Sequence, residues 1–176
     1  MRALAKPPSI RSLTPQDIPA MWRINEQGLP GVGRVARREL TDLLHLCAHA
    51  WGAFEEQGLI GFVLCLRPGM PYGSPNYAWF NEHYDDFLYV DRIAIAQGQR
   101  NSGVGSCLYA RVFKQAQKDA VPVAAEVNLE PPNPGSMRFH ARHHFNQVGT
   151  LNHPSYRVAM VMRPAPKTDA VRKTPN

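Results

Sequence analysis

The chain has 176 residues, of which 44% are hydrophobic and 19% charged, and its formal net charge is +6. This length suits one compact domain that buries about two-thirds of the surface of its unfolded chain. No stretch approaches the roughly 20 apolar residues of a membrane-spanning helix, and no apolar run follows the first residues as in an export signal. We therefore expect a soluble cytoplasmic protein.

The three cysteines are odd in number, far apart in the sequence and surrounded by apolar residues. Cys47, Cys65 and Cys107 therefore favour reduced core thiols over a disulfide framework or a zinc site. This agrees with a cytoplasmic location.

Basic residues gather in two places, and such charge attracts nucleic acid, membranes or polyphosphate ligands. They form no stripe interleaved with aromatic residues, so nucleic acid is not a favoured partner. The second place belongs to a proline-containing end with little to bury, so we expect one domain over residues 1–165 and a disordered basic tail over 166–176. The two groups are Arg34, Arg37 and Arg38, and Arg163, Lys167, Arg172 and Lys173.

The first part of the chain predicts a strand, two helices and a hairpin. Residues 9–13 are typical of a short strand, and Thr14 followed by Pro15 is typical of a helix start. Apolar spacing predicts a second helix over 37–49 and two strands over 50–54 and 59–66 with a tight turn between them. The first helix places on one face Ile18, Met21, Trp22 and Asn25.

Residues 67–85 combine several prolines and glycines with five aromatic residues. A connection of this length without regular structure is usually a functional or a disordered loop. The aromatic residues argue against disorder, so we expect an ordered flap beside a ligand site, or else a satellite cluster of packed aromatic rings. The aromatic residues are Tyr72, Tyr77, Trp79, Phe80 and Tyr84.

The second half alternates strands and helices. Strands are predicted over 87–95, 122–129, 145–151 and 156–162, and helices over 103–120 and 134–143, the latter capped by Asn133. The order of elements predicts an α/β fold with a mixed sheet of about seven strands, flanked on both faces by about four helices.

The turn from Gln99 to Ser106 joins a strand directly to a helix and contains Gly103 and Gly105. Glycine lets consecutive backbone N–H groups point inward, and the N-terminus of the helix adds partial positive charge. Phosphate is the natural ligand for such a turn.

Three phosphate-binding motifs compete for this turn. The Gly-Lys-Ser/Thr of a Walker loop is absent. A dinucleotide fingerprint fits Gly103 and Gly105 but has Leu108 in place of the third glycine, although Glu126 lies at a suitable distance for a ribose contact. The third motif, Gln/Arg-x-x-Gly-x-Gly/Ala after an apolar strand end, is matched completely by residues 100–105.

On this motif the chain resembles the GNAT N-acetyltransferases, which use acetyl-CoA. The resemblance extends to Asn-x-x-Ala/Ser-x-x-x-aromatic with a closing Gly-Phe, where this chain has residues 133–140 and then His144-Phe145. It covers residues 9–163 in element order and 85–150 in motif. More narrowly, segments such as 74–77 and 89–92 look like an uncharacterised bacterial GNAT subfamily.

The resemblance implies where acetyl-CoA lies. Its pyrophosphate sits on the backbone of the turn, and its pantetheine arm pairs like an extra strand with the end of the strand before it. The helix that follows Asn133 lies beside the cofactor. The implied cofactor residues are Ile93, Ala94, Ile95, Arg100, Asn101, Ser102, Gly103, Val104, Gly105, Ser106, Asn133, Ser136 and Phe139.

Acetyl transfer to an amine needs a base, an oxyanion site and a proton for the departing thiolate. Where several relatives carry a tyrosine acid, this chain has His140, which can also be a packed histidine without a catalytic part. Asn128 stands where some relatives have a glutamate base. Strand alternation places Glu126 and Glu130 on its face, as direct or water-mediated bases or as structural carboxylates paired with an arginine.

Three further assignments complete the catalytic prediction. Asp91 is a second candidate base, because a charge in an apolar strand is costly unless it is paired. Tyr89 is a candidate to orient the substrate or relay a proton, and a backbone N–H near Ile93 is implied for the oxyanion. We expect direct attack by a primary amine, with Cys107 buried in a helix stripe and not acting as a nucleophile.

The acceptor is not defined by the motifs. Asn25, Tyr77 and Trp79 are the predicted acceptor-side residues, and relatives that pair through their final strands imply a possible homodimer. His140 and His144 are four apart but lack the adjacent glutamate of a zinc protease, so no metal is expected. The main alternative is a CoA-binding sensor of GNAT fold that has lost catalysis.

Overall fold

The computed structural model describes residues 6–167, so most of the predicted tail lies outside the described residues. Its strands are β1 (Ser9–Ser12), β2 (His49–Glu55), β3 (Gly58–Leu66), β4 (Leu88–Ile95), β5 (Val123–Glu130), β6 (Asn146–Asn152) and β7 (Arg157–Arg163). The α-helices are α1 (Ile18–Gln27), α2 (Arg37–Leu46), α3 (Pro75–His83), α4 (Val104–Asp119) and α5 (Pro134–Arg142). No helix in the described part of the chain is long and apolar enough to cross a membrane.

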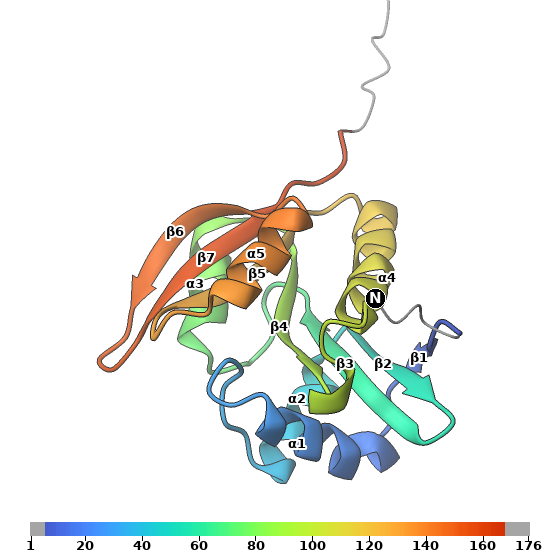
Figure 1. The fold of residues 1–176 in the computed structure, drawn as a ribbon. Coiled ribbons are helices and arrows are strands. Elements are labelled where there is room, and N and C mark those ends of the chain that lie inside the picture. Colours follow the sequence, from blue (N-terminus) through green and yellow to red (C-terminus); the bar gives the residue numbers. More distant parts are fainter. Residues whose placement is uncertain (1–5, 168–176) are drawn as a thin grey trace, which may run out of the picture.

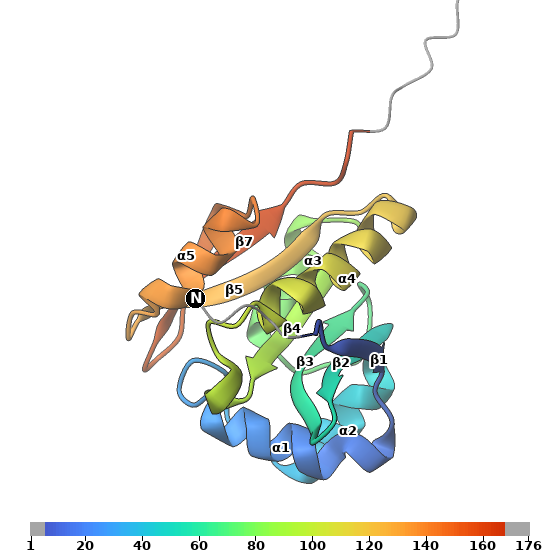
Figure 2. The ribbon, with the colours of Figure 1, turned by 45° about the vertical axis from the view of Figure 1, so that its right-hand side comes forward.

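The seven strands form one mixed sheet in the order β1-β2-β3-β4-β5-β7-β6. This confirms the predicted α/β architecture, with one more helix than expected. The pair β4 and β5 is parallel and short: Leu88 pairs with Val123 and Tyr89 with Ala124, after which the two strands separate. We call this separation the fork, and it is visible in Figures 1 and 2, where β5 turns away from β4.

A β-bulge lies in β4 at the fork. Leu64 of β3 pairs with Arg92 and the next residue, Cys65, pairs with Val90, which leaves Asp91 without an opposite residue. A bulge bends its strand and redirects the neighbouring side chains. The bulge therefore explains how two consecutive charged residues, Asp91 and Arg92, are accommodated in an otherwise apolar strand.

Each face of the sheet has its own apolar core. Buried residues of α1, α2 and α3 pack on one face against β3, β4 and β7. Buried residues of α4 pack on the other face, together with Phe145 between α5 and β6. The fork lies between these two layers, so a ligand in it is reached by elements from both.

The expectation of a flap over residues 67–85 is wrong for its second half, which forms α3. Ser74 caps this helix by accepting a hydrogen bond from the N–H of Tyr77, and Pro75 occupies its first turn. These are standard start signals that the surrounding prolines and glycines obscured. Tyr77 and Phe80 are buried against Phe87 and Tyr89, as in the alternative of a packed aromatic cluster.

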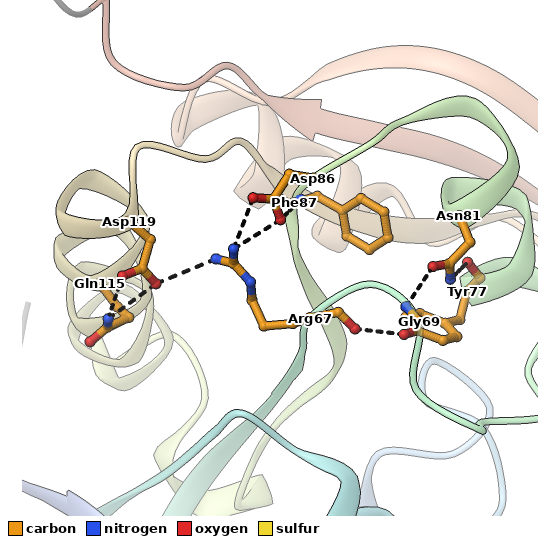
Figure 3. Close-up of polar contacts among 8 residues, drawn as sticks. All are labelled: Arg67, Gly69, Tyr77, Asn81, Asp86, Phe87, Gln115 and Asp119. Carbon is orange, nitrogen blue, oxygen red and sulfur yellow. Dashed lines mark hydrogen bonds and ion pairs between the residues drawn. The ribbon is translucent and has the colours of Figure 1, made fainter.

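Polar contacts anchor this segment to the rest of the fold (Figure 3). Arg67 pairs with Asp86 at 2.9 Å and with Asp119 of α4 at 3.4 Å. The hydroxyl of Tyr77 donates to the carbonyl of Arg67 and accepts from the N–H of Met70. Tyr77 therefore acts as a structural bridge.

Replacing Tyr77 by phenylalanine should lower the free energy of unfolding by about 1–3 kcal/mol, because it leaves a part-buried N–H and a carbonyl without a partner. Urea denaturation measures this change. Tyr84→Phe is the control, because that tyrosine lies at the more exposed end of α3. Equal stabilities of the two variants would show that the bridge contributes nothing.

Candidate active site

The glycine turn opens into a cleft of about 600 Å³, which we call the turn cleft. Every predicted cofactor residue lines it except Ser102, whose hydroxyl donates instead to the carbonyl of Gln99 inside the turn. The other lining residues were missed: Gly28, Gly31, Val32, Gly135 and Arg142. Their signal was weak because Gly28, Gly31 and Val32 come from the distant connection between α1 and α2.

The conformation of the turn depends on left-handed residues. Gly103 has φ +89° and is the N-cap of α4, and Asn101 has φ +59°. Gly105 faces the ring of Phe139, because a Cβ built on Gly105 lies 3.2 Å from that ring. The backbone of the turn is thus open toward the cleft at the positive end of α4.

Helix α5 closes the opposite wall of the turn cleft. The side-chain oxygen of Asn133 accepts a hydrogen bond from the N–H of Ser136 at 3.1 Å, as predicted for an N-cap. Phe139 stacks on Tyr109 of α4 with ring centroids 5.3 Å apart. These contacts hold the two helix N-termini on the same cleft.

A second cleft of about 530 Å³, the fork cleft, adjoins the first and shares Gly31, Val32 and Ile93 with it. It brings together three of the predicted catalytic residues, Asp91, Glu126 and Asn128. Residues from the predicted flap also line it, which agrees with the expectation that part of this segment lies beside a ligand site. The lining residues that sequence reasoning did not assign to a site include Arg34, Tyr72, Ser74, Asn76 and Tyr156.

Glu126 has an unusual electrostatic environment in the fork cleft. The hydroxyl of Tyr89 donates to its carboxyl oxygens at 2.8 and 3.0 Å, so its partner is a tyrosine and not one of the arginines considered from the sequence. Burial and the nearby charge of Asp91 raise the pKa of Glu126 to about 8, although hydrogen bonds from Tyr89 and Asn76 oppose this shift. A carboxyl group with this pKa exchanges protons near neutral pH.

Asp91 is held in an ion pair. Its carboxylate lies 2.8 Å from Nε of Arg92, and the two side chains are only 4% and 10% exposed. The pairing expected for a charge in an apolar strand is therefore present, with the adjacent residue as partner. Asp91 is thus already paired, whereas Glu126, the other carboxyl group that lines the fork cleft, forms no ion pair within residues 6–167.

A family model described as the acetyltransferase (GNAT) family matches residues 18–145, which is most of the chain. The chain belongs to this family. No curated protein matches the sequence. GNAT enzymes use acetyl-CoA, and a metal is not suggested by any cluster of three or more His, Cys, Asp or Glu side chains in the described residues.

Solved structures share this GNAT fold at low sequence identity. Ard1 from Thermoplasma volcanium is 17% identical with a TM-score of 0.73, and the match covers 92% of this chain and 100% of the Ard1 chain. The ribosomal-protein-S18-alanine N-acetyltransferase from Escherichia coli is 12% identical with a TM-score of 0.72, covering 93% and 97%. A GNAT superfamily phosphinothricin acetyltransferase from Sinorhizobium meliloti in complex with AcCoA is 16% identical with a TM-score of 0.70, covering 96% and 94%.

His140, which the sequence analysis considered as the general acid, is buried and lines neither cleft. Its Nε2 lies 2.7 Å from the hydroxyl of Tyr109, and its Nδ1 lies 2.8 Å from the carbonyl of Ser136. Burial lowers its pKa, which favours the neutral ring. The structure therefore does not bring His140 together with Asp91, Glu126 and Asn128.

The predicted acceptor-side residues do not line the fork cleft of this GNAT chain either. Tyr77 is the structural bridge described above, and Trp79 packs against Gly149 and stacks on His83. Asn25 is fully buried and hydrogen-bonded to Gly33 and Arg92. None of the three is therefore in a position to contact a ligand in the fork cleft.

Glu130, the alternative base, is directed away from the fork cleft. A register shift in β5 between Asn128 and Glu130 interrupts the simple alternation on which the prediction rested. The exposed carboxylate of Glu130 pairs with Arg157 at 2.9 Å.

Proposed function

We propose that this GNAT chain is an acetyl-CoA-dependent N-acetyltransferase that transfers the acetyl group directly to a primary amine. The observation that carries the proposal is Glu126, a carboxyl group with a raised pKa that lines the fork cleft, next to the turn cleft. The turn cleft supplies backbone N–H groups and a helix N-terminus for the pyrophosphate of CoA. The fork leaves the end of β4 free to pair with the pantetheine arm.

In the proposed mechanism the amine enters the fork cleft and Glu126 accepts its proton, directly or through a water held by Asn128. Tyr89 orients the Glu126 carboxyl through its hydroxyl. A backbone N–H near Ile93 stabilises the oxyanion, because Ile93 lines both clefts. His140 is hydrogen-bonded to Tyr109 and lines neither cleft, so it has no direct role. CoA leaves as the thiolate, which takes its proton from water.

The pH dependence follows from the protonation of Glu126. Because its pKa is raised, the carboxyl is protonated below pH 8 and becomes a proton acceptor only as the pH rises through about 8. We expect the contribution of Glu126 to kcat/KM to increase about tenfold per pH unit below that value and to level off above it, where only ionisation of the acceptor still raises the rate. Initial rates between pH 6 and 9.5 measure this profile.

The amine acceptor ionises as well, with an ordinary pKa of about 10.4 for an alkyl ammonium group. Glu126→Gln distinguishes the two ionisations. It should abolish the change of kcat/KM with pH near pH 8 and keep the change that is due to the acceptor. A wild-type profile without an inflection near pH 8 would contradict the assignment of Glu126 as base.

A screen for the acceptor tests the proposed function itself. Release of free CoA is measured with an N-terminal alanine peptide, phosphinothricin and a panel of simple amines, since structural neighbours are named for the first two. Turnover with any of these acceptors supports the proposed acetyltransferase activity. Tight acetyl-CoA binding without turnover would favour the CoA-binding sensor, for which the absence of a glutamate at Asn128 is the supporting feature.

A further inference from the structure

The connection between α1 and α2, residues 28–36, forms a wall of both clefts. Gly28, Gly31 and Val32 line the turn cleft, and residues 29–34 line the fork cleft. The connection has no regular secondary structure, so its shape depends on what holds it from outside.

A buried polar cluster behind the fork cleft holds this connection. Nη1 of Arg92 donates to the side-chain oxygen of Asn25 at 3.0 Å and to the carbonyl of Gly33 at 3.2 Å. The amide nitrogen of Asn25 donates to the same carbonyl at 3.1 Å. Asp91 pairs with Nε of Arg92 and thereby orients the guanidinium.

Burying the polar groups of this cluster costs desolvation free energy, and packing alone does not account for their presence. Asn25 is fully buried, and the Asp91–Arg92 pair is nearly so. Taking paired charges out of water commonly gains little stability compared with apolar residues of similar volume. The contacts of the cluster converge on one carbonyl of the connection, Gly33, which points to positioning.

Two further contacts tie the same connection to the other side of the fork. The amide nitrogen of Asn128 in β5 donates to the carbonyl of Pro30 at 3.4 Å. A Cβ built on Gly31 lies 3.1 Å from the amide nitrogen of Asn133, the N-cap of α5. The connection is therefore hydrogen-bonded to β4 and β5 and lies close to the N-cap of α5, and all three elements border the clefts.

We infer that Asn25 and Arg92 are positioning residues that hold residues 28–36 across the fork, and that this shared wall links binding of acetyl-CoA to binding of the acceptor. The link between the two binding events rests on the proposed function, whereas the positioning of residues 28–36 does not. Asn25 accordingly acts on the acceptor site through the connection, without contacting the acceptor as the sequence had suggested.

Limited proteolysis with trypsin tests the positioning without any ligand. Arg34 lies in the connection and is an exposed cleavage site. Asn25→Leu removes the hydrogen bonds to Gly33 and Arg92, so cleavage after Arg34 should become about tenfold faster. Arg92→Lys is the second variant should Asn25→Leu not fold, and it should act in the same direction.

Asn81→Leu is the matched control. Asn81 also makes two hydrogen bonds to backbone groups, of Gly69 and Tyr77, but lies away from the clefts. The positioning role would be overturned if cleavage after Arg34 increased equally in this control and in Asn25→Leu. It would also be overturned if cleavage increased in neither Asn25→Leu nor Arg92→Lys.

Ligand binding tests the link between the clefts. Acetyl-CoA should protect wild-type protein from cleavage after Arg34, because Gly28, Gly31 and Val32 line the turn cleft. Asn25→Leu should weaken this protection and raise both the Kd for acetyl-CoA and the KM for the acceptor about five- to tenfold. A change in only the Kd or only the KM contradicts the link between the two clefts. If wild-type protein does not bind acetyl-CoA, the proposed function is contradicted, but the proteolysis result without ligand still tests the positioning role.

Discussion

Glu126→Gln lowers kcat for acetyl transfer by a factor of about 10² to 10⁴, the usual contribution of a general base. The reason is that the carboxamide cannot accept a proton from the amine at any pH. The affinity for acetyl-CoA stays nearly constant, because Glu126 lines the fork cleft and not the turn cleft. Stopped or coupled assays of CoA release, together with calorimetric titration of acetyl-CoA, measure the two quantities.

The fold of this variant should be preserved. A carboxyl with a pKa of about 8 is mostly protonated at pH 7, so glutamine has nearly the same shape and charge there. Glu130→Gln is the matched control on the same strand, since Glu130 is exposed and paired with Arg157. Equal activity of the two variants would remove Glu126 from the mechanism.

Substituting Gly103 by valine and Gly105 by leucine weakens acetyl-CoA binding by at least about 100-fold, or about 2.7 kcal/mol. A β-branched residue at the φ of +89° found at Gly103 is strained, and a side chain on Gly105 meets the ring of Phe139 in the cleft. Both changes block the approach of a phosphate to the backbone of the turn. Calorimetric titration with acetyl-CoA and CoA measures the loss.

Gly98→Ala is the control for these substitutions. Gly98 precedes the same turn, but a Cβ built on it meets no atom within 4 Å and its φ is not positive. Its affinity for acetyl-CoA should equal that of wild type. If the double variant also bound normally, the pyrophosphate would not lie on the turn.

The glycine turn was predictable because its signals are local. The motif at residues 100–105, the strand before it and the helix after it all follow from neighbouring residues, and nearly all the predicted cofactor residues share one cleft. The fork cleft was only partly predictable. Its residues come from β4, β5 and the loop after it, the α1–α2 connection, the segment before α3 and its first turn, and the β6–β7 turn. The sequence cannot bring these segments together without the tertiary fold.

The remaining differences have specific causes. Bulges in β4 and β5 shift the alternation of side chains, so a simple period of two placed Glu130 beside Asn128. His140 follows the GNAT motif by position, yet the aromatic ring and hydroxyl of Tyr109 provide a buried partner for its ring. Asn25 was predicted to contact the acceptor, whereas in the structure its side chain binds Arg92 and the carbonyl of Gly33.

The place of β7 between β5 and β6 has a consequence for synthesis of the chain. Strand β5, which carries Glu126, has only two residue pairs with β4, and most of its pairing is with β7, where Glu126 lies opposite Met160. Since β7 spans Arg157–Arg163, this partner is among the last described segments to leave the ribosome. The nascent chain therefore carries a complete glycine turn long before its candidate base has a fixed position.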